Sequence, residues 1–168
     1  MQLADFFDYK NQLMKDILTT EEIVKLINGD IDFADAKSLA YTQVFPYEFV
    51  PETTEEGKTY ICFDVDVYES MSSTFLIPQL YIWVFTHRSQ LRLPQGGVRV
   101  DELCNAICKK INGSRFYGLG ELNIYMCKRF APQTDYQGKV IAFRTREVNR
   151  FYDPKKKTPV NRKTDDNS

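Results

Sequence analysis

The stretch Thr59–Tyr68 restricts the possible folds of this chain more than any other, because side chains of two kinds alternate along it. Successive side chains on a β-strand point to opposite faces. One face therefore carries only apolar side chains, those of Ile61, Phe63, Val65 and Val67. The other face begins with Tyr60 and Cys62 and turns polar toward its end, at Asp64 and Asp66. The sequence predicts a strand with one buried face and one face that is partly open.

Three further stretches have the pattern of strands. Phe75–His87 contains the run Leu80–Phe85, which is apolar on both faces and is therefore predicted to lie in the centre of a sheet. The stretches Leu119–Phe130 and Val140–Val148 alternate like strands, and the loop Pro132–Gly138 is expected to join them. The residues between His87 and Val98 include Pro94 and two glycines, which indicate a loop.

Helical patterns precede and interrupt these strands. Apolar side chains between Leu3 and Leu18 recur on one helical face. Thr19 and Glu22 have the spacing of a capping box for a second, short helix that ends at Asn28-Gly29. Val98–Ile111 is amphipathic. The predicted fold class is α+β, a small and mostly antiparallel sheet with a helix packed on one face, in the order α-α-β-β-α-β-β.

The remaining segments set the predicted domain limits. Residues 30–58 form a long connection in which Pro46 and Pro51 restrict any strand to a short or edge position. Residues 1–152 are predicted to form a single α+β domain. Residues 153–168 bury almost nothing and are predicted to form a flexible basic tail.

Charge is unevenly distributed along the chain, although the net charge is only −1. Residues 1–57 carry twelve acidic and four basic residues, residues 58–149 have a net charge of +4, and the remainder has +3. An acidic front and a basic back can pair between copies. Ordinary solvated surface remains the alternative. The chain has no run of about 18 apolar residues that would span a membrane, and its first residues lack the features of a secretion signal.

The four cysteines give little support to a metal site. Cys62, Cys104, Cys108 and Cys127 contain no C-x₂-C pair, and they are expected to be reduced and mostly buried thiols. Asp64, Asp66 and Glu69 could form a carboxylate cluster for Mg²⁺, as in a metal-dependent nuclease. The following strand has no lysine in the run Leu80–Phe85, so acids exposed at an interface or to solvent are the favoured interpretation. No metal or cofactor is predicted.

Other candidate sites are equally sparse. The single histidine, His87, lies beside Arg88 with no nucleophile elbow, so no catalytic triad and no enzyme activity are predicted. Lys155, Lys156 and Lys157 could contact a phosphate backbone. A docking arm for a protein partner or a solvated end are the alternatives.

Three stretches of the sequence form a distinctive set. They are Ile17–Ile27, then Val44–Pro51 with its Phe-Pro-Tyr piece followed by Lys58–Val65, and then Val84–Arg88 with its Thr-His-Arg piece followed by Arg99–Leu103. These stretches resemble the small neck and tail-completion proteins of tailed bacteriophages. The order of the elements resembles the tail terminator family in particular, with the similarity extending over about Phe6 to Val148.

This resemblance implies a virion structural protein of the phage neck, assembled in the host cytoplasm. The implied partners are other copies in a homo-hexameric ring, the major tail tube protein and the head connector, with DNA only as passing cargo. A head-tail connector or head-closure protein and a small cytoplasmic nucleic-acid-binding module remain alternatives. The predicted protein-interface residues are Asp64, Asp66, Glu69, His87, Arg88, Arg92, Lys155, Lys156 and Lys157.

Overall fold

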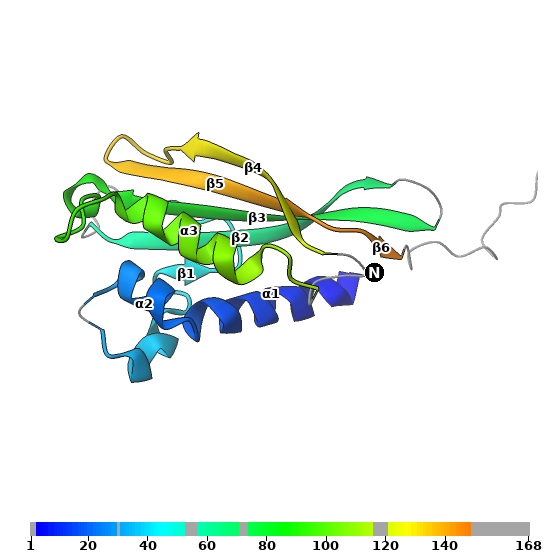
Figure 1. The fold of residues 1–168 in the computed structure, drawn as a ribbon, viewed down its shortest axis with the longest axis horizontal. Helices are drawn as coiled ribbons and strands as arrows, with labels where there is room; N and C mark the ends of the chain where they lie inside the picture. Colours follow the sequence, from blue (N-terminus) through cyan, green and yellow to red (C-terminus); the bar gives the residue numbers. More distant parts are fainter. Residues whose placement is uncertain (1–2, 30, 53–56, 71–73, 116–120, 149–168) are drawn as a thin grey trace, which may run out of the picture.

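A twisted sheet lies against a layer of three α-helices in the computed structural model of the chain (Figure 1). The structure describes residues 3–29, 31–52, 57–70, 74–115 and 121–148. The strand order is β1-β2-β3-β5-β4, and the short β6 pairs with β3. All pairings between these strands are antiparallel except that of β1 with β2. The predicted α+β class and mostly antiparallel sheet are confirmed.

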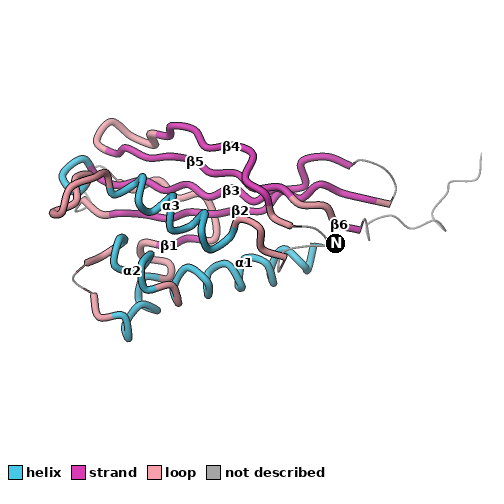
Figure 2. The backbone as a smooth tube through the Cα atoms, in the orientation of Figure 1, coloured by secondary structure: helices cyan, strands magenta, loops and turns pink. Residues whose placement is uncertain are grey.

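The elements follow one another in the predicted order, with short additions. The helices are α1 (Leu3–Leu18), α2 (Glu21–Ile27) and α3 (Arg99–Ile111), with 3-10 turns η1 (Phe33–Leu39) and η2 (Arg88–Gln90). The strands are β1 (Val44–Phe45), β2 (Thr59–Ser70), β3 (Phe75–His87), β4 (Asn123–Phe130), β5 (Tyr136–Arg144) and β6 (Glu147–Val148). Figure 2 shows the helices gathered on one side of the strands.

The alternation of β2 decides which face of the sheet is covered. Ile61 and Phe63 are fully buried, and they join side chains from β3, β5 and the helices in one core. Its central members also include Ile82, Val84, Ile141, Phe143, Leu13, Ile17, Ile23, Leu103 and Ile107. Burying a side chain of this size contributes about 1.5–3 kcal/mol. The helices therefore hold to the sheet through the face that the sequence marks as apolar.

The structure corrects several predicted boundaries. Thr19 and Glu22 form no capping box, because Thr20 is the N-cap residue of α2 and its hydroxyl donates to the Asp16 carbonyl instead. Strand β5 starts at Tyr136, inside the loop expected to reach Gly138, and the predicted strand Val140–Val148 is divided between β5 and β6.

The connection 30–58 and the tail 153–168 are the two remaining predicted segments. The connection 30–58 contains η1 and the edge strand β1, which agrees with the limit that its prolines impose. The predicted tail, 153–168, lies outside the described residues.

Two β-bulges interrupt the sheet near one end. In β2 the register shifts between Val67 and Glu69, and in β4 it shifts between Ile124 and Met126. A bulge leaves one residue without a cross-strand partner and bends the strand. The residues left over are Tyr68 and Tyr125. Both bulges lie close to the pair that Gln79 and Arg144 make across the sheet, and they shape the face described below.

Gly138 gives a test of the close packing between β3 and β5. A Cβ atom at this position would lie 2.3 Å from the carbonyl oxygen of Val84 and 2.5 Å from Cβ of Phe85. We predict that Gly138→Ala lowers the free energy of unfolding by about 1–3 kcal/mol, the usual cost of overpacking. Urea denaturation measures the change.

Gly29→Ala is the matched control, because its added Cβ would meet only the Lys25 carbonyl at an ordinary 3.7 Å. This change should stay within about 0.5 kcal/mol of the parent protein. Equal stabilities for the two variants would show that β3 and β5 do not pack as described.

Candidate interaction surface on the open sheet face

The face of the sheet away from the helices carries aromatic and charged side chains. Cross-strand partners point to the same face, so the register places Asp66, Gln79 and Arg144 together in one row across three strands. The next rows contain Tyr81 and Trp83, whose rings stack with centroids 5.7 Å apart. We call this surface the open face. Its central members are Tyr68, Tyr81, Trp83, Tyr125, Arg144, Asp66 and Gln79.

Arg144 is the best-anchored charged side chain on the open face. Its guanidinium carbon lies 3.8 Å from the ring centroid of Tyr68 and 3.7 Å from that of Tyr125. Its Nε donates a hydrogen bond of 3.1 Å to Oε1 of Gln79. The two rings come from the two bulges, so β2 and β4 meet over one cation. Arginine stacks on aromatic faces in this way.

One end of the open face is closed by an aromatic cluster. Phe45 stacks on Phe49 with centroids 4.1 Å apart, and Tyr60 lies 5.4 Å from Phe85. Tyr136 joins them edge-on, 5.9 Å from Phe85. The segment after β1 thus covers this end of the sheet. The exposed part of the face lies toward the bulges, where Tyr68 is 53% and Tyr125 40% exposed.

The predicted acidic residues have different surroundings. Asp64 leans over the edge of β2, where it forms an ion pair of 2.6 Å with Lys10 of α1 and accepts the N–H of Val65 at 2.7 Å. Asp66 is exposed and forms no ion pair within the part of the chain that the structure describes. The side chain of Glu69 lies outside the described residues. Of the two predicted acids whose side chains the structure describes, Asp66 is the one that remains available to a partner.

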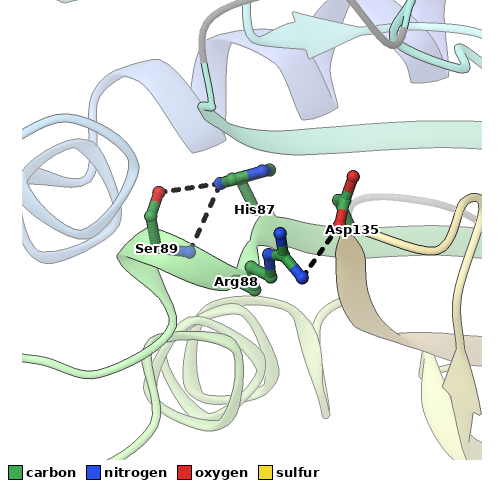
Figure 3. Close-up of polar contacts among 4 residues, drawn as sticks. All are labelled: His87, Arg88, Ser89 and Asp135. Atoms are coloured by element: carbon green, nitrogen blue, oxygen red, sulfur yellow. Dashed lines mark hydrogen bonds and ion pairs between the residues drawn. The ribbon is translucent and has the colours of Figure 1, made fainter.

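His87 and Arg88 anchor a corner of the fold, as Figure 3 shows. His87 Nδ1 lies 2.7 Å from the hydroxyl of Ser89 and accepts the Ser89 N–H at 3.3 Å. Arg88 pairs with Asp135 at 3.3 Å, and its backbone N–H donates to the Asp135 carbonyl. These contacts tie the end of β3 to the turn before β5. A structural role accounts for both side chains, and their role at an interface stays a prediction.

Arg92 lies in a different place from the acids. It lines an open cleft of about 780 Å³ together with Lys58 and Arg99. Arg99 bridges this region by donating to the carbonyls of Gln90, at 2.8 Å, and Leu26, at 2.6 Å. Burial lowers the pKa of Arg99. Lys155, Lys156 and Lys157 lie outside the described residues. Among the described ones, Asp66 is the cross-strand partner of Gln79, whereas His87, Arg88 and Arg92 lie at or beyond the far end of β3, so these residues do not form one site.

Sequence reasoning missed the aromatic clamp on Arg144. Tyr68 and Tyr125 are ordinary strand residues by pattern, and the bulges that turn them toward Arg144 depend on pairing between distant strands. The sequence feature that could have indicated this clamp is the frequent occurrence of tyrosine on strands whose other face is apolar. Tyrosine, tryptophan and arginine are the residues most enriched at the centres of protein interfaces.

The cysteines are dispersed over the two faces of the sheet. Cys62 lies on the open side within the aromatic cluster, whereas Cys127 shares the helix side with Cys104 and Cys108. Cys62 and Cys104 are buried as predicted, Cys108 is half-buried, and Cys127 is exposed, which corrects the expectation for that residue. Among the described residues no group of three histidine, cysteine or acidic side chains could hold a metal ion.

Burial makes two of these thiols unreactive. It raises the pKa of both Cys62 and Cys104 to about 12. The reactive species of cysteine is the thiolate, so at pH 8 we predict rapid reaction of Cys127 with a disulfide reagent. Cys62 and Cys104 should react only after unfolding. Mass spectrometry of the labelled protein assigns the order, with Cys127→Ser as the control that removes the fast phase.

The same shifts give a pH dependence. A folded-state pKa above the unfolded value means that the stabilising contribution is present below about pH 9 and is lost as the pH rises toward 12. The free energy of unfolding should therefore fall above pH 9, which urea denaturation at a series of pH values measures. In the labelling experiment described above, fast reaction of Cys104 in the folded protein would contradict its buried position.

The fold and this surface define an α+β protein with one helix-covered and one open sheet face. The YomW family model matches residues 11–145, and the chain belongs to this family. No curated protein matches the chain. A chain in the solved structure of the virion of a native gene transfer agent particle is similar over 79% of this chain and 97% of that chain, with 16% identity and a TM-score of 0.42. None of the helices in the described ranges combines the length and the hydropathy that a membrane span requires.

Proposed function

We propose that this chain is a non-enzymatic structural protein of a phage-type virion, and specifically a tail terminator that assembles as a hexameric ring in the neck. The observation that carries the proposal is the separation of charge between two sides of the molecule. Support also comes from the likeness of the Phe45-Pro46-Tyr47 and Thr86-His87-Arg88 stretches to tail-completion proteins.

Helix α1, from the acidic front of the sequence, and strand β4, from the basic remainder, lie on opposite sides of the fold. Figure 1 shows α1 along one side and β4 along the other. Residues 3–29 and 31–52 carry nine acidic and four basic side chains, whereas β4 carries Lys128 and Arg129, both exposed, and no acid. Opposite charges on opposite sides favour a head-to-tail contact between copies.

The edge of β4 suits such a contact. In the sheet of described strands β4 pairs only with β5, so its outer backbone groups face away from the sheet. The bulge at Tyr125 and the two basic side chains protect this edge against indiscriminate strand pairing. Lys128 and Arg129 would attract an acidic surface of a neighbouring copy. A head-to-tail contact closes into a ring when its rotation divides a full turn, and the ring then offers a surface to the tail tube on one side and the head connector on the other.

Salt dependence tests the proposed contact. We predict assemblies larger than one chain at low ionic strength that dissociate as salt rises, because screening shortens the reach of exposed charges from about 10 Å at 0.1 M to about 3 Å at 1 M. Analytical ultracentrifugation at a series of salt concentrations measures the masses. The double variant Lys128→Ser/Arg129→Ser should remain smaller at low salt.

A matched control, Lys58→Ser/Lys110→Ser, removes two exposed bases that are not part of β4 and should assemble like the parent. A parent protein that stays monomeric at every salt concentration would sink the proposal of a preformed ring. Equal effects of the two double variants would instead show that net charge, rather than the β4 side, drives assembly.

The basic end of the chain gives a second test. Deleting Asp153–Ser168 removes Lys155, Lys156 and Lys157 together with little apolar surface, so we predict an unchanged melting temperature and weaker binding to an acidic neck partner. Fluorescence anisotropy with labelled duplex DNA distinguishes the nucleic-acid alternative. We expect weak DNA binding that disappears by physiological salt. Tight, salt-resistant binding that depends on these residues would favour a nucleic-acid-binding module.

A further inference from the structure

A row of three side chains on the open face has opposite charges at its ends. Asp66, Gln79 and Arg144 are cross-strand neighbours on β2, β3 and β5. Strands lie about 4.8 Å apart, so the two charged residues are separated by about 10 Å across the sheet. Within the described residues Arg144 has no carboxylate partner and Asp66 has no basic partner. The row therefore presents one acid and one base that the described part of the chain leaves unneutralised.

The centre of this row contains an incomplete hydrogen-bonding group. Gln79 is fully buried, and its Oε1 accepts from Arg144, but its Nε2 has no hydrogen-bond partner in the described structure. A buried donor without an acceptor costs free energy. A partner that supplies an oxygen close to the Arg144 clamp would relieve this cost. The hydrogen bonding of Gln79 is thus incomplete among the residues that the structure describes.

The geometry of the row is self-complementary. A half-turn about an axis parallel to the strands places a second copy face to face with the first and reverses the order of its strands. Asp66 of each copy then lies opposite Arg144 of the other. Sheets stacked in this aligned manner pack about 10 Å apart, a gap that an arginine and an aspartate bridge together. We propose that two copies of this chain pack through their open faces, with two reciprocal Asp66–Arg144 ion pairs.

The aromatic side chains around the row are suited to the same contact. Tyr68 and Tyr125 fix the guanidinium of Arg144, so little side-chain freedom remains to be lost on binding. The stack of Tyr81 on Trp83 continues the surface along β3. A phosphate backbone fits this face less well, because the carboxylate of Asp66 would oppose its charge. The charge pattern therefore favours a second copy over a nucleic acid.

This contact goes beyond the proposed function. It is isologous, since the same patch is used by both copies, whereas the ring contact joins β4 to the opposite side of a neighbour. Two copies can pair through the open faces whether or not a ring closes. An experiment can therefore disprove the open-face contact while the ring contact through β4 stands, and the reverse also holds.

Charge reversal tests the pairing directly. Asp66→Lys sets a lysine opposite Arg144 at both contacts of a pair, and Arg144→Glu sets a glutamate opposite Asp66. We expect each variant to weaken its own dimerisation at least about tenfold, because like charges placed face to face oppose binding. Mixing the two variants should restore association, since both contacts of the mixed dimer then join opposite charges. Sedimentation equilibrium of each protein and of the equimolar mixture gives the dissociation constants.

Trp83 supplies an independent readout, because it is the single tryptophan of the chain and lies on the open face. Its quenching by acrylamide should fall with dimer formation in the parent protein and in the mixture, but not in either variant alone. Lys110→Glu on α3 is the control for a reversed charge, and it should dimerise like the parent. Circular dichroism and thermal melting establish that every variant is folded.

Three outcomes would overturn the inference. The mixture could fail to associate better than the separate variants, or the parent could keep Trp83 equally accessible at all concentrations. A single-stranded oligonucleotide could also protect Trp83 at physiological salt in an Arg144-dependent way, which would make the open face a nucleic-acid surface. If salt-dependent assembly through β4 persists in Arg144→Glu while mixing has no effect, the proposed function stands and the open-face contact does not.

Discussion

Three helices pack on one face of β2, β3 and β5, and the other features of the molecule follow from this packing. Ile61 and Phe63 commit that face to the core, and the period of two then sends Tyr60, Cys62 and Asp66 to the other side. A shift by one residue would turn the aspartates of β2 toward the helices. The charged side chains that cannot be buried thus fix the register of β2 as firmly as the apolar side chains that must be buried.

The open face acquires its character from departures from regular pairing. Two bulges leave Tyr68 and Tyr125 outside the regular strand ladder, and the rings of both residues lie against the guanidinium of Arg144. The two rings hold the guanidinium of Arg144 in place, and Asp66 lies on the same face, two strands away. Within the described residues this arrangement leaves two charges and a buried amide unmatched, and a protein partner with the opposite charges and a hydrogen-bond acceptor would match them.

The sequence predicts the parts of this fold that depend on local periodicity. The faces of β2, the central position of β3 and the amphipathic α3 follow from side-chain spacing alone. The missing capping box shows the limit of local motifs, because Thr20 bonds back to α1 and the helix begins one residue later than the motif requires. Cys127 is exposed because β4 is an edge strand, and the clamp on Arg144 needs contacts between β2, β4 and β5. Neither the exposure of Cys127 nor the clamp on Arg144 could be predicted from residue spacing, because both depend on strand order.

If this chain works by being built into a particle, the composition of purified particles must show it. Quantitative mass spectrometry of particles, separated into heads, tails and complete virions by density, measures the copies of this chain per particle. We predict a small, fixed number that remains with the neck or tail fraction after a high-salt wash, in a ratio consistent with one ring. Absence from washed particles, with the chain abundant in the soluble fraction of the same cells, would contradict a virion role.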